Sequence, residues 1–134
     1  LTTDIIAGFC SETEEDHQDT LSLMDFVKYN FGYMYSYSER PGTLAGRKME
    51  DDVTDETKAR RLQEIVDLQQ KHAWFRSEEF IGQTVEVLVE KVSKSITVVF
   101  PKENYKIGDF VNVRIISCTS GTLKGEAVGL SDMN

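Results

Sequence analysis

The apolar run Thr3-Asp4-Ile5-Ile6-Ala7-Gly8-Phe9 is followed closely by the acidic stretch Ser11-Glu12-Thr13-Glu14-Glu15-Asp16. A short apolar run of this kind is consistent with a buried strand. Ser11 and Glu14 match a capping box, and acidic side chains stabilise a helix N-terminus, so the sequence predicts a helix to about Tyr29. A strand followed by a helix is the unit from which parallel α/β sheets are built.

The same order of elements then repeats. Residues Phe31 to Tyr37 carry an aromatic ring at every second position, which is strand spacing, and such a stripe usually packs in a core or on a sheet face. A turn is predicted at Arg40-Pro41-Gly42-Thr43. A second helix is predicted from Thr54 to about Glu79. The first part of the chain is therefore predicted to be strand–helix–strand–helix.

The hydrophobic pattern changes after Gly82. Alternating or β-branched runs follow one another with turns between them, at residues 84–90, 96–100, 110–118 and 123–130. Short strands in so little chain are expected to close into a small barrel, because closure removes exposed edges. The predicted fold class is α+β, with an α/β domain over residues 1–80 and a small antiparallel barrel resembling an OB fold over residues 81–134.

Composition narrows the class of protein. The chain has 134 residues, of which 40% are hydrophobic and 28% charged, as in globular domains. No run approaches the ~20 apolar residues that cross a bilayer. Cys10 and Cys118 exclude a disulfide scaffold and fit a reducing, cytoplasmic compartment. The start at Leu1 resembles no signal peptide and reads as the interior of a longer polypeptide.

Charge is distributed unevenly along the chain. The net charge is −8, and residues 1–80 account for all of it. Residues 91–124 hold six basic and two acidic residues, and a locally basic face favours phosphate binding. The alternative is that these cations are solvated side chains that blunt strand edges. The candidate phosphate contacts are Lys91, Lys94, Lys102, Lys106, Arg114 and Lys124.

Few residues could carry chemistry. His17 and His72 lie in predicted helices without a second ligand four residues on, so a surface or packing role is expected for each. Cys10 and Cys118 are too far apart for a local metal motif. We therefore predict no catalytic and no metal-ligating residue. Ligands of α/β folds bind at the carboxyl ends of strands, which directs attention to the turn at Gly8 and to the Arg40–Thr43 loop.

Several stretches resemble the radical-SAM methylthiotransferases. Residues 3–16 resemble the TDIIVGFPGETEEDF stretch of that family, and residues 37–43 resemble its YSxRPGT stretch. Residues 61–69 resemble the helix that precedes its TRAM domain. Residues 82–90 and 106–111 resemble the TRAM domain itself. The Arg-Pro-Gly-Thr turn is similar to the tRNA-modifying branch, the MiaB type, and differs from the RimO branch, whose target is a ribosomal protein.

The resemblance implies a function. The family adds a methylthio group to N6-isopentenyladenosine beside the tRNA anticodon, with S-adenosylmethionine and two 4Fe–4S clusters as cofactors. Residues 1–80 would be the end of the radical-SAM barrel, with Gly8, Arg40 and Gly42 near S-adenosylmethionine. Residues 81–134 would be a TRAM barrel that binds the tRNA anticodon arm. No membrane partner is implied.

The sequence departs from the family pattern in three places. The cluster cysteines are absent, so this chain alone is expected to bind no cluster or other cofactor and to be inactive. Cys10-Ser11 replaces Pro-Gly, which is expected to loosen that turn. The connection Lys91–Ser95 is shorter than the family's segment, which contains a Gly-Arg-Thr stretch; either the loop is shortened or further residues belong between these positions.

Besides the tRNA-modifying enzyme, two interpretations remain open: a protein-interaction module and a RimO-like enzyme. The barrel strands that would close the sheet of residues 1–80 are missing, so exposed edges could support self-association. Such edges, together with the acidic helices, are also compatible with a protein-interaction module. A RimO-like enzyme is the third interpretation.

Overall fold

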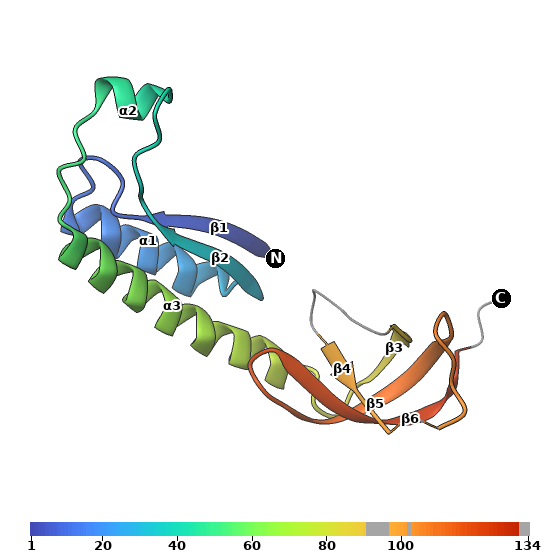
Figure 1. Ribbon diagram of the computed structural model, residues 1–134. Coiled ribbons are helices and arrows are strands. Elements are labelled where there is room, and N and C mark those ends of the chain that lie inside the picture. The colour runs from blue at the N-terminus through green and yellow to red at the C-terminus, as the bar shows by residue number, and fades with distance from the viewer. Residues whose placement is uncertain (91–96, 102, 132–134) are drawn as a thin grey trace. The chain divides into compact units, whose positions relative to one another are not determined.

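The computed structural model describes residues 1–90, 97–101 and 103–131 (Figure 1). The chain divides into two compact units, Leu1–His72 and Ala73–Asn134. Within the described residues, no helix combines the length and the apolar character needed to cross a membrane. The division falls inside a long helix, α3 (Asp55–Glu78), whose last residues belong to unit 2.

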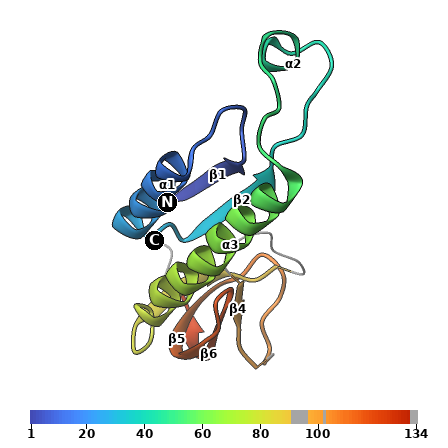
Figure 2. The same ribbon diagram turned by 90° about the vertical axis from the view of Figure 1, so that its left-hand side faces the viewer.

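Unit 1 contains the predicted strand–helix–strand–helix order. Its elements are β1 (Thr2–Ala7), α1 (Glu14–Val27), β2 (Phe31–Ser36), a short α2 (Leu44–Lys48) and most of α3. β1 and β2 pair in parallel, with Thr2 opposite Phe31 and Ala7 opposite Ser36. α1 and α3 lie on the same face of this two-stranded sheet (Figures 1 and 2).

The start of α1 differs from the prediction. The cap is Thr13, whose hydroxyl accepts the backbone N–H of Asp16 at 3.1 Å, while the Asp16 carboxylate accepts the Thr13 N–H at 2.8 Å. The capping box predicted for Ser11 and Glu14 is therefore wrong. Three acidic residues nevertheless occupy the first turn of the helix, where they complement its dipole.

The core of unit 1 lies between the sheet and the two long helices. Ala7, Met24 and Ile65 are almost fully buried there. The other face of the sheet is open: Phe31, Tyr33 and Tyr35 are 47%, 53% and 56% exposed. Of the two places expected for this aromatic stripe, a core or a sheet face, the structure shows the sheet face, because β2 turns its odd-numbered side chains away from α1 and α3.

Polar contacts connect α1 and α3 in a constant register. Glu14 contacts Arg61, His17 contacts Glu64 and Asp25 contacts His72, and each pair is separated by 47 residues. A constant offset means that the two helices run in the same direction, as expected for neighbouring helices on a parallel sheet. Of the surface or packing role expected for the two histidines, the structure shows packing, since His17 is 1% and His72 4% exposed.

Unit 2 is a curled, mixed half-barrel that fits an OB-like fold. Its strands are β3 (Thr84–Leu88), β4 (Thr97–Val99), β5 (Phe110–Cys118) and β6 (Thr122–Leu130), in the order β3-β5-β6-β4. β4 pairs with β6 in parallel, so the sheet is not antiparallel throughout as predicted. In the described residues β3 and β4 are not paired with each other, and the barrel is open there.

The core of unit 2 lies on the concave side of this sheet, where the inward side chains of β5 and β6 meet. The fully buried members are Val111, Val113, Ile115 and Leu123. Register shifts along the β5–β6 pair bend the strands. A Cβ at Gly125 would lie 2.5 Å from the Arg114 carbonyl oxygen, so this close approach requires glycine.

Candidate functional sites

The turn after β1 is held by the chain's own side chains. Gly8 has a φ of +75° and donates its N–H to the Glu12 carboxylate at 3.0 Å. Ser11 has a φ of +65° and donates its N–H to the Asp52 carboxylate at 2.6 Å. The left-handed Ser11 is thus bonded to a carboxylate from a distant part of the chain. That Cys10-Ser11 loosens this turn relative to Pro-Gly remains a prediction.

Gly8 is packed against α3. A Cβ at this position would lie 2.3 Å from Cγ of Lys58, and Gly8 is buried. Lys58 is itself 5% exposed, and its Nζ donates to the Asp51 carboxylate at 2.6 Å. The small size of residue 8 is therefore required by packing. Its predicted proximity to S-adenosylmethionine remains a prediction.

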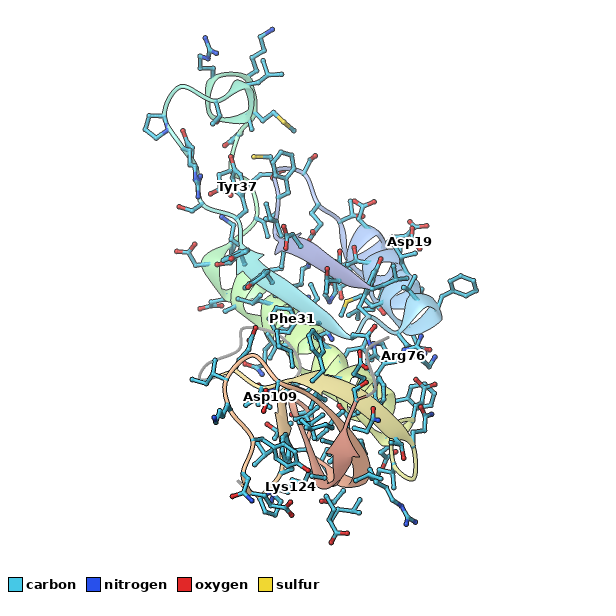
Figure 3. The ribbon with its side chains drawn as sticks, turned by 90° about the vertical axis from the view of Figure 1, so that its right-hand side faces the viewer. Asp19, Phe31, Tyr37, Arg76, Asp109 and Lys124 are labelled. Carbon is cyan, nitrogen blue, oxygen red and sulfur yellow. The ribbon has the colours of Figure 1, made fainter. Side chains whose placement is uncertain are left out.

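A cluster of aromatic and thiol groups lies beside this turn. The rings of Phe9 and Tyr37 meet edge to face at 5.0 Å, and Nζ of Lys58 lies 5.3 Å from the Tyr37 ring centroid. A hydrogen bond with the Cys10 thiol, followed by burial, raises the pKa of Tyr37 above its ordinary value. Tyr37 is labelled in Figure 3, where the chain leaves the sheet after β2. The group stabilises the carboxyl end of the sheet.

Arg61 anchors the turn to α3. Its Nη1 donates to the Glu12 carbonyl oxygen at 2.9 Å and to the Glu12 carboxylate at 2.8 Å, and its Nη2 lies 3.3 Å from Glu14. Arg60 donates to Glu14 at 2.6 Å, and this hydrogen bond is the main cause that lowers the pKa of Glu14 to about 2. These contacts form an arginine–glutamate network across α1 and α3.

Three possible metal ligands occur in the same network. Ligand atoms of Glu14, His17 and Glu64 all lie within 4.8 Å of one another. Arg60 already donates to both carboxylates, and Nε2 of His17 is bonded to Glu64 at 2.5 Å. A metal ion would have to displace the guanidinium group and break these hydrogen bonds. The geometry therefore supports an ion-pair network at this place.

The residues of this chain do not fit an iron–sulfur cluster. Such a cluster takes three or four cysteine thiolates. Cys10 is buried in unit 1 and Cys118 is half-buried in unit 2, where burial and then the Glu78 charge raise the pKa of its thiol. A raised pKa disfavours the thiolate that binds metal.

The Arg40–Thr43 loop leads into α2. The Thr43 hydroxyl donates to the Arg40 carbonyl oxygen at 2.8 Å and accepts the Gly46 N–H at 3.1 Å. Gly42 has a φ of +87°, and a Cβ at this position would lie in open space. Arg40 and Gly42 are exposed. Their predicted role near S-adenosylmethionine remains a prediction.

Three of the six candidate phosphate contacts lie in the described part of unit 2. Lys106, Arg114 and Lys124 are exposed. Arg114 is opposite Glu126 in the β5–β6 register, so both lie on the same face. Figure 3 labels Lys124, on β6, and Asp109, in the turn before β5. The described outer face is therefore mixed in charge. Lys91, Lys94 and Lys102 lie outside the described residues.

The backbone also shapes the turn at Lys106. Its N–H donates to the Asp109 carboxylate at 2.8 Å, and Gly108 has a φ of +95°. This turn presents Lys106 to solvent at the amino end of β5. Ile107 beside it is 71% exposed.

Sequence reasoning missed the buried cations Lys58 and Arg61, whose helical spacing gives no sign of their carboxylate partners.

Comparison with known proteins shows which proteins this chain is similar to. The TRAM domain family matches residues 78–128. The whole chain is 80% identical to a tRNA-2-methylthio-N(6)-dimethylallyladenosine synthase of Flavobacterium johnsoniae. It is 61% identical to the synthase of that name in Christiangramia forsetii. A Bacteroides fragilis synthase is 50% identical over 96% of the chain. The chain spans about a third of these relatives, covering 30% of the first two and 31% of the third.

The OB-like fold of unit 2 agrees with the family match, and unit 2 therefore contains a TRAM domain. Over its whole length the chain is similar to tRNA methylthiotransferases of the MiaB type, which confirms the resemblance seen in the sequence.

Proposed function

We propose that this chain is the C-terminal part of a tRNA methylthiotransferase, in which unit 2 binds the tRNA anticodon arm. The observation that carries the proposal is the 80% identity over the whole chain to a synthase of that activity, together with the TRAM match at residues 78–128. In this proposal the whole protein converts N6-isopentenyladenosine to its 2-methylthio form with S-adenosylmethionine and two 4Fe–4S clusters. The clusters bind to cysteines outside this chain, and the chain alone is inactive.

We further propose that unit 1 completes a radical-SAM barrel. Its parallel sheet is covered by helices on one face only, whereas parallel sheets normally have both faces covered. The uncovered face carries Ile6, Phe31, Tyr33 and Tyr35, all exposed by about half. In the whole protein this face would line the barrel. In the isolated chain the same face and the open strand edges support self-association.

A binding titration tests the RNA proposal. We expect fluorescent tRNA to bind the chain with an affinity that falls as salt rises, and unit 2 should contribute roughly −2 to −3 to the slope in log units if three or four of its cations contact phosphate. Arg114 and Glu126 lie opposite each other on the outer face, so removing either charge gives a matched comparison of tRNA affinity. Arg114→Gln should weaken binding and Glu126→Gln should strengthen it. Binding without salt dependence, or no binding, would contradict the proposal.

A further inference from the structure

Residues 38–54 of unit 1 form an excursion that leaves the sheet at the carboxyl end of β2 and returns at the start of α3. α2 lies at its far end (Figures 1 and 2). Three cations of the excursion, Arg40, Arg47 and Lys48, are exposed. Ligands of α/β folds bind at the carboxyl ends of the strands, and the excursion starts at that end of the sheet.

Most other cations of unit 1 form ion pairs with carboxylates, whereas Arg40, Arg47 and Lys48 form none in the part of the chain that the structure describes. Lys58 is paired with Asp51, Arg60 with Glu14, and Arg61 with Glu12. Within the described residues, no carboxylate oxygen lies within 4.0 Å of the Arg40, Arg47 or Lys48 side-chain nitrogens. Unit 1 is acidic as a whole, so a group of unpaired cations is unusual for it. Their charge remains available for an external anion.

The excursion has a defined local structure. Thr43 caps α2 and bonds back to the Arg40 carbonyl oxygen. A Cβ at Gly46 would lie 2.7 Å from that oxygen, so the two segments approach closely. At its return, Asp52 accepts the Ser11 N–H and Asp51 accepts Lys58. Cations on a loop with fixed geometry lose less conformational entropy on binding than cations on a loose one.

We propose that Arg40, Arg47 and Lys48 contact the phosphate backbone of the tRNA, beside the carboxyl end of the sheet. The inference rests on the proposed function and adds a second RNA contact to the one proposed for unit 2. A polyanion is the partner that fits, because three exposed cations that form no ion pair within 4.0 Å with any described carboxylate match a series of phosphates. The role of Arg40 is then to bind RNA, in place of the cofactor role expected from the sequence.

The test compares single charge removals in the whole chain. Lys48→Gln and Arg40→Gln each remove one cation from the excursion. Lys71→Gln is the matched control, because Lys71 is an exposed lysine of unit 1 on α3. Each variant is titrated against fluorescent tRNA at several salt concentrations. Circular dichroism spectra establish that all three variants are folded as the parent chain is.

We expect each excursion variant to weaken tRNA binding by about threefold or more at low salt and to reduce the salt slope by about 0.7 to 0.9, the value for one lost phosphate contact. Lys71→Gln should leave both unchanged. If the excursion variants bind as the parent does while Arg114→Gln binds more weakly, the inference is wrong and the proposed function stands. If the parent chain does not bind tRNA, the proposed function itself fails.

Discussion

Arg61 on α3 donates two hydrogen bonds to Glu12, to its carbonyl oxygen at 2.9 Å and to its carboxylate at 2.8 Å. The same Glu12 carboxylate accepts the N–H of Gly8 at the end of β1. One buried arginine thus connects the second long helix to the turn where β1 ends. The conformation of this turn depends on residues 49 positions away in the sequence.

Replacing Arg61 is expected to destabilise unit 1 strongly. Arg61→Met leaves the Glu12 carboxylate without its cation in a largely buried place, which costs roughly 3 to 5 kcal/mol when a buried pair is broken. Arg60→Met is the control, because Arg60 is about half exposed and an exposed pair contributes about 0 to 1 kcal/mol. Urea denaturation measures both. Equal losses would show that the buried contact has no special importance.

A double variant separates charge from packing. If the cost of Arg61→Met comes from the uncompensated Glu12 charge, Glu12→Gln in the same chain should recover part of the lost stability. No recovery would assign the loss to packing of the arginine side chain. The free energy of unfolding of the double variant decides between the two.

Ser11→Gly is expected to stabilise the chain. A left-handed conformation costs an L-residue about 1 to 2 kcal/mol, and glycine avoids that cost but loses about 0.5 to 1 kcal/mol more entropy on folding. The net gain should be about 0.5 kcal/mol, since the backbone N–H bond to Asp52 is retained. Ser22→Gly within α1 should instead destabilise by about 0.5 to 1 kcal/mol. Thermal unfolding measures both, and a loss of stability at Ser11 would contradict the account.

Two glycines test what the packing against Lys58 contributes. Gly8→Ala and Gly42→Ala both place alanine at a positive φ, which costs about 1 to 2 kcal/mol. Only at Gly8 would the new Cβ also lie 2.3 Å from Lys58. Gly8→Ala should therefore destabilise by clearly more than Gly42→Ala in urea denaturation. Equal losses for the two variants would show that Gly8 faces open space.

The Glu14 carboxyl should titrate far below its ordinary range. Its pKa is lowered from 4.5 to about 2, mainly by the hydrogen bond from Arg60. Because the folded pKa is the lower one, this contact stabilises the fold above pH 4.5 and is lost as pH falls toward 2. Carbon-detected NMR titration of the carboxyl should show this, and Arg60→Gln should raise the pKa. A midpoint near 4.5 in the parent chain would contradict the network.

The sequence predicted the element order of unit 1 because each element has a clear period. It did not predict α2, which is only five residues long and has no periodic apolar face. The Ser11–Glu14 pattern predicts a helix start at Ser11, and only the backbone shows that Thr13 is the cap. The parallel pairing of β4 with β6 could not be predicted, since strand partners depend on tertiary packing.

The candidate site residues, too, could be predicted from the sequence only in part. Exposed Lys106, Arg114 and Lys124 follow from strand alternation and turn position, which the sequence contains. The paired state of Lys58 and Arg61 does not follow, because on a helix both resemble solvated cations, and the Glu12 partner of Arg61 lies on the turn before α1. The exposure of the aromatic stripe depends on which face of the sheet the helices cover.

The proposal on which the others depend is that this chain is part of a protein that adds a methylthio group to tRNA. Mass spectrometry of the nucleosides in tRNA from cells that lack the gene tests it most directly. We expect 2-methylthio-N6-isopentenyladenosine to disappear and N6-isopentenyladenosine to accumulate, with both restored by the whole gene. Restoration should fail for a gene truncated before residue 81. Unchanged levels of the methylthio nucleoside in cells without the gene would contradict the account.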